Sequence, residues 1–589
     1  MQQIWELDTI YPGGSQSPQA AEAHKELKQQ LAELEGSMPN SEQSVETVWL
    51  AWLEAFQRVA TRVEQLQSFY SCCMAQDVND TIAKQRYSQL QNEAAHFEQI
   101  DTSLASTLAA MDANTWQHLV ATAFADVAFP VLEKRQQQAL KMDAAKEQLV
   151  TALATDGYHG WSQLYDVVVG RIHVDVEIDG ERQRLSVGQA ENLFASGDAR
   201  VRQSVFNGWE QAWAQDADLG AEALNHIGGY RLALYKQRGW DRHLDEPLRL
   251  NRMSQLTLDA MWEGVRTSRQ RLIPYMERKA ELLHVERLSW ADQDAPLNAE
   301  EAKISYDEAC GFVAGQFQVF NPDMAAFAEQ ALAARWVEAE DRSGKMPGGF
   351  CIGFPEQGQS RIFMTYGGTY SSLSTLAHEL GHAYHSHLLR NLPPLRQAYA
   401  MNVAETASTF AELLVSDAAL KTAASPGQRL NLLDQRLQQA VALLMNIDAR
   451  FTFEDRFYAA RAQGPLTVDE LNELMETAQK ESYLNQLSQY HPLFWVSKLH
   501  FYLTDVPFYN FPYTFGYLFS AGLYSQFQHG DEDFAGTYEA LLRDSGSMTV
   551  EDLAEKHLAV RLDRPEFWQQ ACQTVLQDVD LFIAASKTM

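Results

Sequence analysis

The five residues His378-Glu379-Leu380-Gly381-His382 constrain the fold more strongly than any other stretch of the sequence. Two histidines four residues apart lie about one turn apart on an α-helix, where both imidazoles reach one metal ion. The glutamate between them is offset around the helix axis, so it meets a metal-bound water without being a ligand. Typical residue frequencies place the bare motif in roughly 2% of chains of this length. Its surroundings must therefore decide what it does.

The residues around the motif predict an amphipathic helix. Apolar side chains recur at helical spacing along one stripe: Leu373, Leu376, Ala377, Leu380 and Tyr384. His378, His382 and His385 fall within about 60° of each other on the opposite side. The alternative is a buried helix whose histidines only bond to neighbours. That alternative fits Glu379 poorly, because a buried carboxylate needs a partner.

Glu405 is the residue expected to complete the metal site. Catalytic zinc takes three protein ligands and keeps one open position. Glu405 is the first acidic residue after Glu379, and the prolines at 393–394 must end the first helix, so that a second helix returns beside it. Small and apolar residues surround Glu405, which disfavours a solvated acidic face. Glu412 lies two turns further on, where it either faces solvent or accepts a histidine N–H at the site.

Two blocks of sequence resemble the active-site signature of the oligoendopeptidase F and thimet-oligopeptidase family of zinc metallopeptidases. They are residues 366–385, which include YGGT and STLAHELGHAYH, and residues 403–409, VAETAST. The opening WELDTIYPG at 5–13 and the ending PEFW at 565–568 resemble the oligoendopeptidase F branch. The resemblance covers essentially the whole chain. It implies one Zn2+ per chain, held by His378, His382 and Glu405.

The resemblance also implies roles for other residues. Glu379 would be the general base that activates a zinc-bound water. A late histidine and tyrosines would bind substrate and stabilise the oxyanion, and these roles map to His500, Tyr513 and Tyr517. The interval between His500 and Tyr513 is longer than in the thimet branch, so the choice among Tyr502, Tyr509, Tyr513 and Tyr517 stays open. The residues expected to bind substrate are Tyr366, Gly367, Gly368 and Tyr509.

Strand patterns are few in this sequence. Residues 348–354 and 361–366, directly before the metal-binding helix, predict a small sheet. Its edge strand could pair with an extended peptide through main-chain hydrogen bonds, or the sheet could be purely structural. Residues 167–169, 172–178 and 182–185 predict a hairpin with a tight Asp-Gly turn.

Most of the chain shows helical periodicity, at residues 20–35, 43–75, 80–112, 132–155 and 428–450 among others. We therefore predict a mainly α fold of antiparallel helices with a small β-sheet beside the zinc helix. The resemblance implies a large multi-helical body with a deep substrate channel. The expected domains are an N-terminal helical region at 1–112, a small helical and hairpin region at 113–190, and a catalytic region at 191–589.

The composition limits the cellular compartment and the binding partners that we expect for this protein. The net charge is −31, from 78 acidic and 47 basic residues, so we expect no binding to nucleic acid or to anionic membrane. The five cysteines are scattered and contain no C-x-x-C pair, which fits a reducing compartment. No basic, apolar leader opens the sequence and no run of 18 apolar residues follows. We expect a cytoplasmic protein.

The resulting hypothesis is a zinc-dependent endopeptidase that hydrolyses internal bonds of short unstructured oligopeptides. One alternative is a metallo-carboxypeptidase or dipeptidase on the same scaffold. Another is a non-catalytic peptide-binding protein. The intact Glu379 argues against the second alternative, because a pure binder needs no general base.

Overall fold

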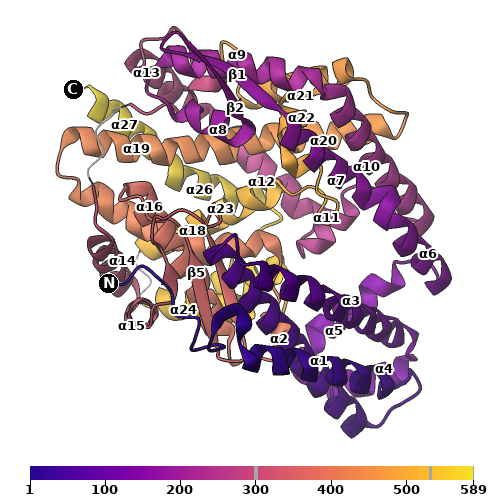
Figure 1. The fold of residues 1–589 in the computed structure, drawn as a ribbon. Coiled ribbons are helices and arrows are strands. Elements are labelled where there is room, and N and C mark those ends of the chain that lie inside the picture. Colours follow the sequence, from indigo (N-terminus) through magenta and orange to yellow (C-terminus); the bar gives the residue numbers. More distant parts are fainter. Residues whose placement is uncertain (298–302, 530–532, 588–589) are drawn as a thin grey trace. The chain divides into compact units, whose positions relative to one another are not determined.

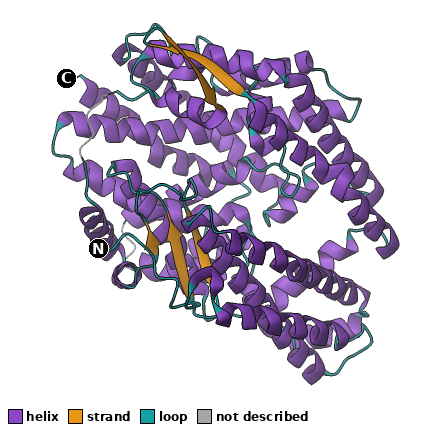
Figure 2. Ribbon diagram, viewed as in Figure 1, coloured by secondary structure: helices purple, strands orange, loops and turns teal. Residues whose placement is uncertain are grey.

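The computed structural model consists mainly of helices with two small sheets (Figure 2), and it describes residues 1–297, 303–529 and 533–587. The predicted mainly α fold is confirmed. The chain forms two compact units, each built from separate stretches of sequence. Unit 1 contains Met1–Lys141, Ala302–Ala418 and Gln526–Ala559, and unit 2 contains Met142–Glu301, Ala419–Ser525 and Val560–Met589. The domain boundaries expected at 112 and 190 stay a prediction.

Unit 1 holds the metal-binding motif. Its helices are α1 (Pro18–Gly36), α2 (Glu46–Gln76), α3 (Thr81–Ala110), α4 (Ala113–Ala121), α5 (Ala128–Ala139), α14 (Tyr306–Phe320), α15 (Pro322–Ala333), α16 (Tyr370–Leu389), α17 (Pro394–Gln397), α18 (Met401–Thr422), α24 (Phe534–Asp544) and α25 (Val550–Leu558). Figure 1 shows α1, α2 and α3 side by side in indigo, where they pack on one another. One hydrophobic core joins these helices to the nearby sheet through Phe354 and Phe363.

The sheet of unit 1 has the strand order β3-β5-β4, with β3 at Val337–Glu338, β4 at Phe350–Phe354 and β5 at Gln359–Phe363. β4 pairs antiparallel with β5, and α16 packs on both strands. Both predicted strands are therefore present, the first shorter at its start and the second beginning two residues earlier and ending three earlier than predicted. β4 lies at the edge of the sheet.

Unit 2 contains α6 (Ala144–Ala154), α7 (Gly160–Arg171), α8 (Val187–Asn192), α9 (Ala199–Gln215), α10 (Ala217–Arg238), α11 (Asp245–Leu250), α12 (Gln255–Ser268), α13 (Ile273–Leu282), α19 (Pro426–Val441), α20 (Ile447–Arg461), α21 (Val468–Ser482), α22 (Phe494–Ser497), α23 (Phe511–Gln528), α26 (Pro565–Leu576) and α27 (Asp578–Ser586). β1 (His173–Ile178) and β2 (Glu181–Ser186) form the predicted hairpin, with Asp179 and Gly180 at its turn. The hairpin packs on α9.

Three details of the predicted secondary structure are wrong. Residues 167–169 are helical, because Tyr165 and Val168 share the buried side of α7 while Val167 faces outward. The helix expected at 132–155 is two helices, because the Asp143 side chain accepts a hydrogen bond from Lys146 N and starts α6 anew. The helix expected at 428–450 is interrupted by a π-helical turn at Ala442–Asn446.

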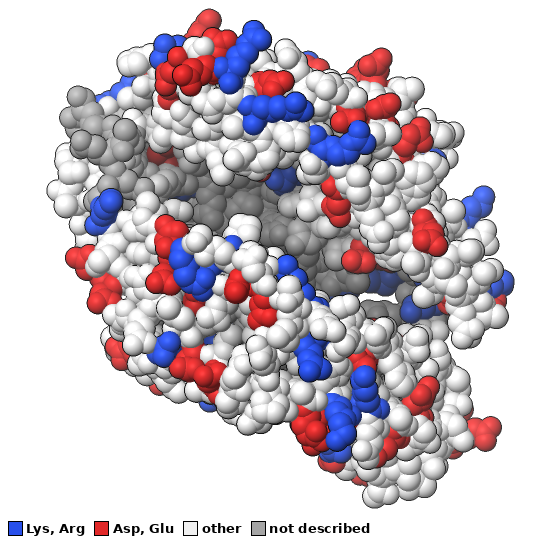
Figure 3. Space-filling view, in the orientation of Figure 1, with Lys and Arg blue, Asp and Glu red and all other residues white. Residues whose placement is uncertain are grey.

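Charged side chains of both signs are interspersed over the face drawn in Figure 3, despite the net charge of −31. Every helix in the described part of the chain is too short or too polar to cross a membrane.

Helices α16 and α18 approach each other closely at Gly381. A Cβ atom built on Gly381 would lie 2.6 Å from the Ala407 carbonyl oxygen and 2.7 Å from the Ser408 Cα. Only glycine allows this separation of the two backbones. The helix that carries both motif histidines therefore lies directly against the segment that carries Glu405.

Replacing Gly381 by alanine should destabilise the protein, because the added methyl group must push α18 away from α16. Overpacking of this kind typically costs about 1–3 kcal/mol. The urea midpoint, followed by circular dichroism, measures the effect. Gly315, inside α14 with no atom within 4 Å of a built Cβ, is the matched control. Gly315→Ala should be neutral or stabilising by up to about 1 kcal/mol, because alanine favours helix. Equal midpoints for the two variants would contradict the close approach.

Candidate active site

Helix α16 begins at a defined cap and divides into two faces. The Thr369 side chain accepts a hydrogen bond from Ser372 N at 3.2 Å, after Gly368 with φ +76°. The predicted apolar stripe is buried at all five positions: Leu373, Leu376, Ala377, Leu380 and Tyr384. His378 and His382 are half-buried away from that stripe. The sequence therefore predicted the orientation of this helix correctly.

Three side chains converge where α16 meets α18. His378 Nε2 lies 3.1 Å from His382 Nε2 and 3.3 Å from Glu405 Oε2, and His382 Nε2 lies 3.5 Å from the same oxygen. Among the residues that the structure describes, these three form the one group able to hold a metal ion. The structure thus brings the three predicted ligands together.

Carboxylates and hydroxyls around this group fix its orientation. Glu412 Oε1 bonds to His378 Nδ1, which must carry the proton because the carboxylate is an acceptor. His378 Nε2 is then the nitrogen left to bind a metal. The Ser408 hydroxyl donates to Glu405 Oε2 at 2.8 Å. Of the two interpretations of Glu412, the contact favours a supporting residue over a solvated one.

The spacing of the three donor atoms fits a zinc ion. Donor atoms 2.0–2.1 Å from a tetrahedral zinc lie about 3.3–3.4 Å apart, close to the observed separations. Two imidazole nitrogens and a carboxylate oxygen facing one point repel each other unless a cation lies between them. Two histidines and one carboxylate form a ligand set typical of catalytic zinc.

The electrostatics of the group are those of a cation site. Burial lowers the pKa of His378, but the hydrogen bond and charge of Glu412, with the charge of Glu405, raise it to about 9. Burial raises the pKa of Glu405, but the hydrogen bond and charge of His382 and the charge of His378 lower it to about 2. In the protein without metal, a proton on His378 takes the place of the missing positive charge.

Glu379 is buried beside the three ligands, with 5% of its surface exposed. Burial raises the pKa of its carboxyl. Its Oε2 atom has no hydrogen-bond partner among the described residues. Such an oxygen is costly unless it accepts a hydrogen bond from a molecule bound at the site.

Gly349, directly before the edge strand β4, is a neighbour of Glu379 that sequence reasoning missed. A Cβ built on Gly349 would lie 3.4 Å from Glu379 Oε1. The start of the edge strand therefore borders the candidate base. The glycine pair at 348–349 was the available signal, because a strand that begins with glycine often allows close approach of another group.

His385 lies outside the metal group, although its position on the helix is near His378 and His382. It is fully buried, bonds to Ser545 Oγ at 2.9 Å and stacks on Tyr399. Burial lowers its pKa to about 3. This histidine is part of the packing between α16 and the end of α24.

The loop at 366–368 is tied to its surroundings. The Tyr366 hydroxyl donates to the Ile304 carbonyl at 3.0 Å, and Ile304 N donates to the Gly368 carbonyl at 2.9 Å. Gly367 N donates to Ser372 Oγ at 3.0 Å. These contacts make the Tyr366 side chain a buried anchor of the loop. The predicted binding of substrate by Tyr366, Gly367 and Gly368 stays a prediction.

In unit 2, the contacts of His500 determine its protonation. Asn510 Oδ1 faces Arg450 Nη1 at 3.1 Å and His500 Nδ1 at 2.7 Å. Arginine only donates, so this atom of Asn510 must be the oxygen, and His500 Nδ1 must donate to it. Burial, with the charges of Arg450 and Lys498, lowers the pKa of His500 to about 4. At neutral pH His500 Nε2 is therefore a hydrogen-bond acceptor.

The structure separates the late tyrosines into distinct environments. Tyr509 and Tyr513 are half-buried, and their ring centroids lie 5.0 and 6.2 Å from that of His500. Tyr517 follows one turn later in α23 and is 4% exposed. Tyr502 is fully buried, stacks on Tyr165 and donates to the Gly220 carbonyl at 3.4 Å. Its hydroxyl is thus part of the core of unit 2.

Comparison with known proteins agrees with this geometry. The sequence profile of Peptidase family M3 matches residues 300–574, which include all three candidate ligands, and that of Oligopeptidase F matches residues 108–173. The chain therefore contains a segment that matches Peptidase family M3, preceded by one that matches Oligopeptidase F. Oligoendopeptidase F, chromosomal, from Lactococcus lactis subsp. cremoris is 23% identical over 396 residues, 67% of this chain and 65% of that protein. Oligopeptidase PepF of Bacillus subtilis is 23% identical over 68% of this chain and 60% of that protein.

These alignments thus span slightly less than two thirds of the curated relatives, whereas solved structures match the fold along nearly the whole chain. Oligoendopeptidase-F from Enterococcus faecium has a TM-score of 0.72 at 20% identity, covering 97% of this chain and 99% of that one. A protein from Chlamydophila abortus has a TM-score of 0.85 at 18% identity, covering 99% of this chain and 98% of that one. The chain therefore shares the fold of these structures at low sequence identity.

Metal affinity should rise with pH up to about 9. The proton that His378 holds below this pKa must leave before Nε2 binds a metal. The apparent association constant should increase about tenfold per pH unit between pH 7 and 9 if one proton is displaced. Competition with a chromophoric chelator, corrected for the protonation of the chelator, measures it on the apoprotein. In Glu412→Gln the rise in metal affinity should end at a lower pH, because the carboxylate that raises the pKa of His378 is gone. An affinity constant that does not change between pH 7 and 9 would contradict this account.

Proposed function

We propose that this protein is a zinc-dependent endopeptidase that hydrolyses internal bonds of short unstructured oligopeptides. The observation that carries the proposal is the convergence of His378, His382 and Glu405 next to the unpartnered Oε2 of Glu379. Zinc would be held by the two Nε2 atoms and the Glu405 carboxylate. When bound, it would supply a Lewis acid that polarises a carbonyl and lowers the pKa of water.

Glu379 is proposed as the general base. Its carboxyl is buried, and burial raises its pKa toward neutrality, where a base both accepts and returns protons. Oε2 would take a proton from the attacking water and later pass it to the leaving amine. Glu412 would keep the His378 ring oriented throughout, because its carboxylate holds the Nδ1 proton.

The late segment is proposed to handle the substrate. His500 presents a lone pair on Nε2, so it would accept an N–H group from the main chain of the peptide. Because its Nε2 is an acceptor, His500 cannot donate a hydrogen bond to an oxyanion. That task would belong to a tyrosine hydroxyl, Tyr513 or Tyr517, and one such donor typically contributes about 3–4 kcal/mol. Tyr509, whose ring contacts those of both His500 and Tyr513, would contact the substrate.

The edge strand β4 is proposed to bind the peptide backbone. It begins next to Glu379, and only one of its sides is paired within the sheet of unit 1. Main-chain pairing is independent of side-chain identity, which suits mixed oligopeptides as substrates. The expected deep channel, the cytoplasmic location and the absence of nucleic-acid and membrane partners stay predictions.

An internally quenched peptide with both ends blocked tests the proposal. The full-length protein should release two fragments identified by mass spectrometry, and a chelator should abolish the reaction until zinc is restored. Glu379→Gln should lower kcat by at least about 10³-fold while one zinc per chain remains bound. If the protein left blocked peptides intact but removed terminal residues from peptides with free ends, a carboxypeptidase or dipeptidase would be favoured.

The same assay separates the tyrosines. Loss of the oxyanion donor should lower kcat by roughly 10²-fold to 10³-fold and change KM less. Either Tyr513→Phe or Tyr517→Phe should show this effect. Tyr502→Phe is the matched control, because its hydroxyl is committed to Gly220. If Tyr502→Phe alone lowered kcat, the assignment of the late segment would be wrong.

A further inference from the structure

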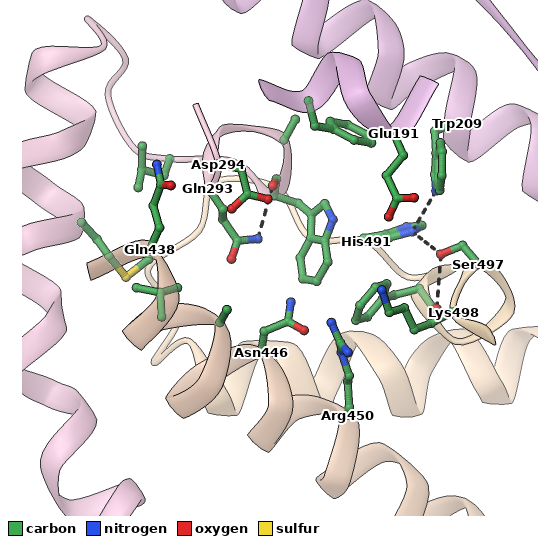
Figure 4. Close-up of a pocket in the computed structure, with 18 of the residues that line it drawn as sticks. Glu191, Trp209, Gln293, Asp294, Gln438, Asn446, Arg450, His491, Ser497 and Lys498 are labelled. Carbon is green, nitrogen blue, oxygen red and sulfur yellow. Dashed lines mark hydrogen bonds between the residues drawn. The ribbon is translucent and has the colours of Figure 1, made fainter. Parts of the chain in front are cut away.

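A cavity of about 210 Å³ lies within unit 2 (Figure 4). Its walls come from α8, α9, α13, α19, α20 and the segments at 288–294 and 491–498. Aromatic rings line it, among them Trp209, Trp290 and Phe494. Besides Lys279 and His491, four charged residues line it: Glu191, Asp294, Arg450 and Lys498. The balance of their charges limits the kind of ligand that the cavity can hold.

Two cations share one end of this cavity. Figure 4 shows the heads of Arg450 and Lys498 near each other and turned into the open space. Arg450 lies over the Phe494 ring at 5.1 Å and donates only to the neutral Asn510 amide, and its Nε is buried without a partner. The Lys498 ammonium makes no hydrogen bond or ion pair within the described part of the chain.

The other buried charges of the cavity are compensated by protein groups. Lys279 pairs with Asp434 at 3.3 Å and donates to the Gln293 carbonyl at 2.9 Å. His491 pairs with Glu210. At Lys279 and His491, acidic side chains of unit 2 itself therefore supply the partner. Arg450 and Lys498 form no ion pair with a described residue, and the carboxylates of Glu191 and Asp294 act on them only from a distance.

Burial makes this arrangement unfavourable in the empty cavity. Burial and the neighbouring Lys498-Arg450 repulsion lower the pKa of Lys498 to about 8, and burial lowers that of Arg450 to about 10. A bound anion would relieve both effects, because it would bring a negative charge into direct contact with both cations. Arginine and lysine together offer the forked and point-charge donors that carboxylates accept.

Two carboxylates limit the charge of the ligand. Glu191 and Asp294 also line the cavity and form no ion pair with a described residue. Two cations and two anions around one space disfavour a multiply charged anion such as phosphate. They suit a molecule with one carboxylate whose remainder is neutral or cationic.

We propose that this cavity binds the free α-carboxylate of an amino acid or peptide end, with Arg450 and Lys498 as its anchors. Peptides are the ligand class because of the proposed function, on which this inference rests. A short hydrogen-bonded chain links Arg450 through Asn510 to His500, at 3.1 and 2.7 Å. The carboxylate site is thus adjacent, within unit 2, to the histidine proposed to contact substrate.

Equilibrium binding to the full-length Glu379→Gln protein tests the proposal without consuming the ligand. Two N-acetylated heptapeptides of the same sequence are compared, one with a C-terminal carboxylate and one with a C-terminal amide. The acid should bind about tenfold or more tightly, because charge-assisted hydrogen bonds are lost in the amide. Adding Lys498→Met should remove most of this preference.

Lys236→Met is the matched control, because it removes the same charge from an exposed site in α10. It should keep the preference for the acid. Equal affinity of acid and amide would overturn the proposal, and so would a preference that survives Lys498→Met. If Lys498→Met fails to fold, Glu191→Gln gives a test of opposite sign. It should tighten acid binding several-fold by removing a like charge, and unchanged or weaker binding would overturn the proposal.

Further ligands identify the source of the carboxylate. If an N-acetylated single amino acid also binds more tightly as the acid than as the amide, the cavity binds small products. A preference confined to the heptapeptide assigns it to the chain end of a substrate. Inorganic phosphate that displaces the acid peptide at similar concentration would overturn the carboxylate assignment.

Failure of this inference is distinguishable from failure of the proposed function. Cleavage of blocked peptides by the wild-type protein, with no acid preference in binding, removes only the cavity proposal. Acid preference without cleavage or metal dependence removes only the endopeptidase proposal.

Discussion

The close approach of α16 and α18 at Gly381 is the constraint on which the rest of the site depends. It places the Glu405 carboxylate within 3.3–3.5 Å of two imidazole nitrogens that come from the other helix. Glu412, two turns after Glu405 on α18, then reaches the far nitrogen of His378. One glycine inside the motif therefore allows both the candidate metal ligands and the carboxylate that bonds to one of them to come together.

The same side chain has opposite properties in the two units because its neighbours differ. His378 is surrounded by carboxylates, which raise its pKa to about 9, so that without a metal it holds a proton at neutral pH. His500 is buried near Arg450 and Lys498 and has its pKa lowered to about 4, so it stays neutral. Each unit also contains a buried polar atom without a hydrogen-bond partner among the described residues. In the described part of the chain, Glu379 Oε2 and Arg450 Nε lack hydrogen-bond partners where the proposed chemistry supplies a ligand.

The sequence predicted the parts of the site that depend on local periodicity. The apolar stripe of α16, the two histidines and the return of Glu405 on a second helix all follow from spacing and from the proline break. It did not predict Gly349 beside Glu379, the bond of Tyr366 to Ile304 or the burial of Tyr502. Those contacts join residues that are distant along the chain, or depend on side-chain packing, and no periodic pattern encodes them. Helix interruptions at Asp143 and at 442–446 were missed for a similar reason, since a cap or a π-helical turn barely changes the apolar period.

X-ray absorption at the metal edge of the zinc-loaded, full-length protein tests the central claim most directly. The account predicts one zinc per chain with two imidazole nitrogens and one carboxylate oxygen from the protein. Glu405→Ala should remove the carboxylate contribution while both imidazoles remain. A spectrum with thiolate sulfur, or one that Glu405→Ala leaves unchanged, would contradict a metal site assembled where α16 meets α18.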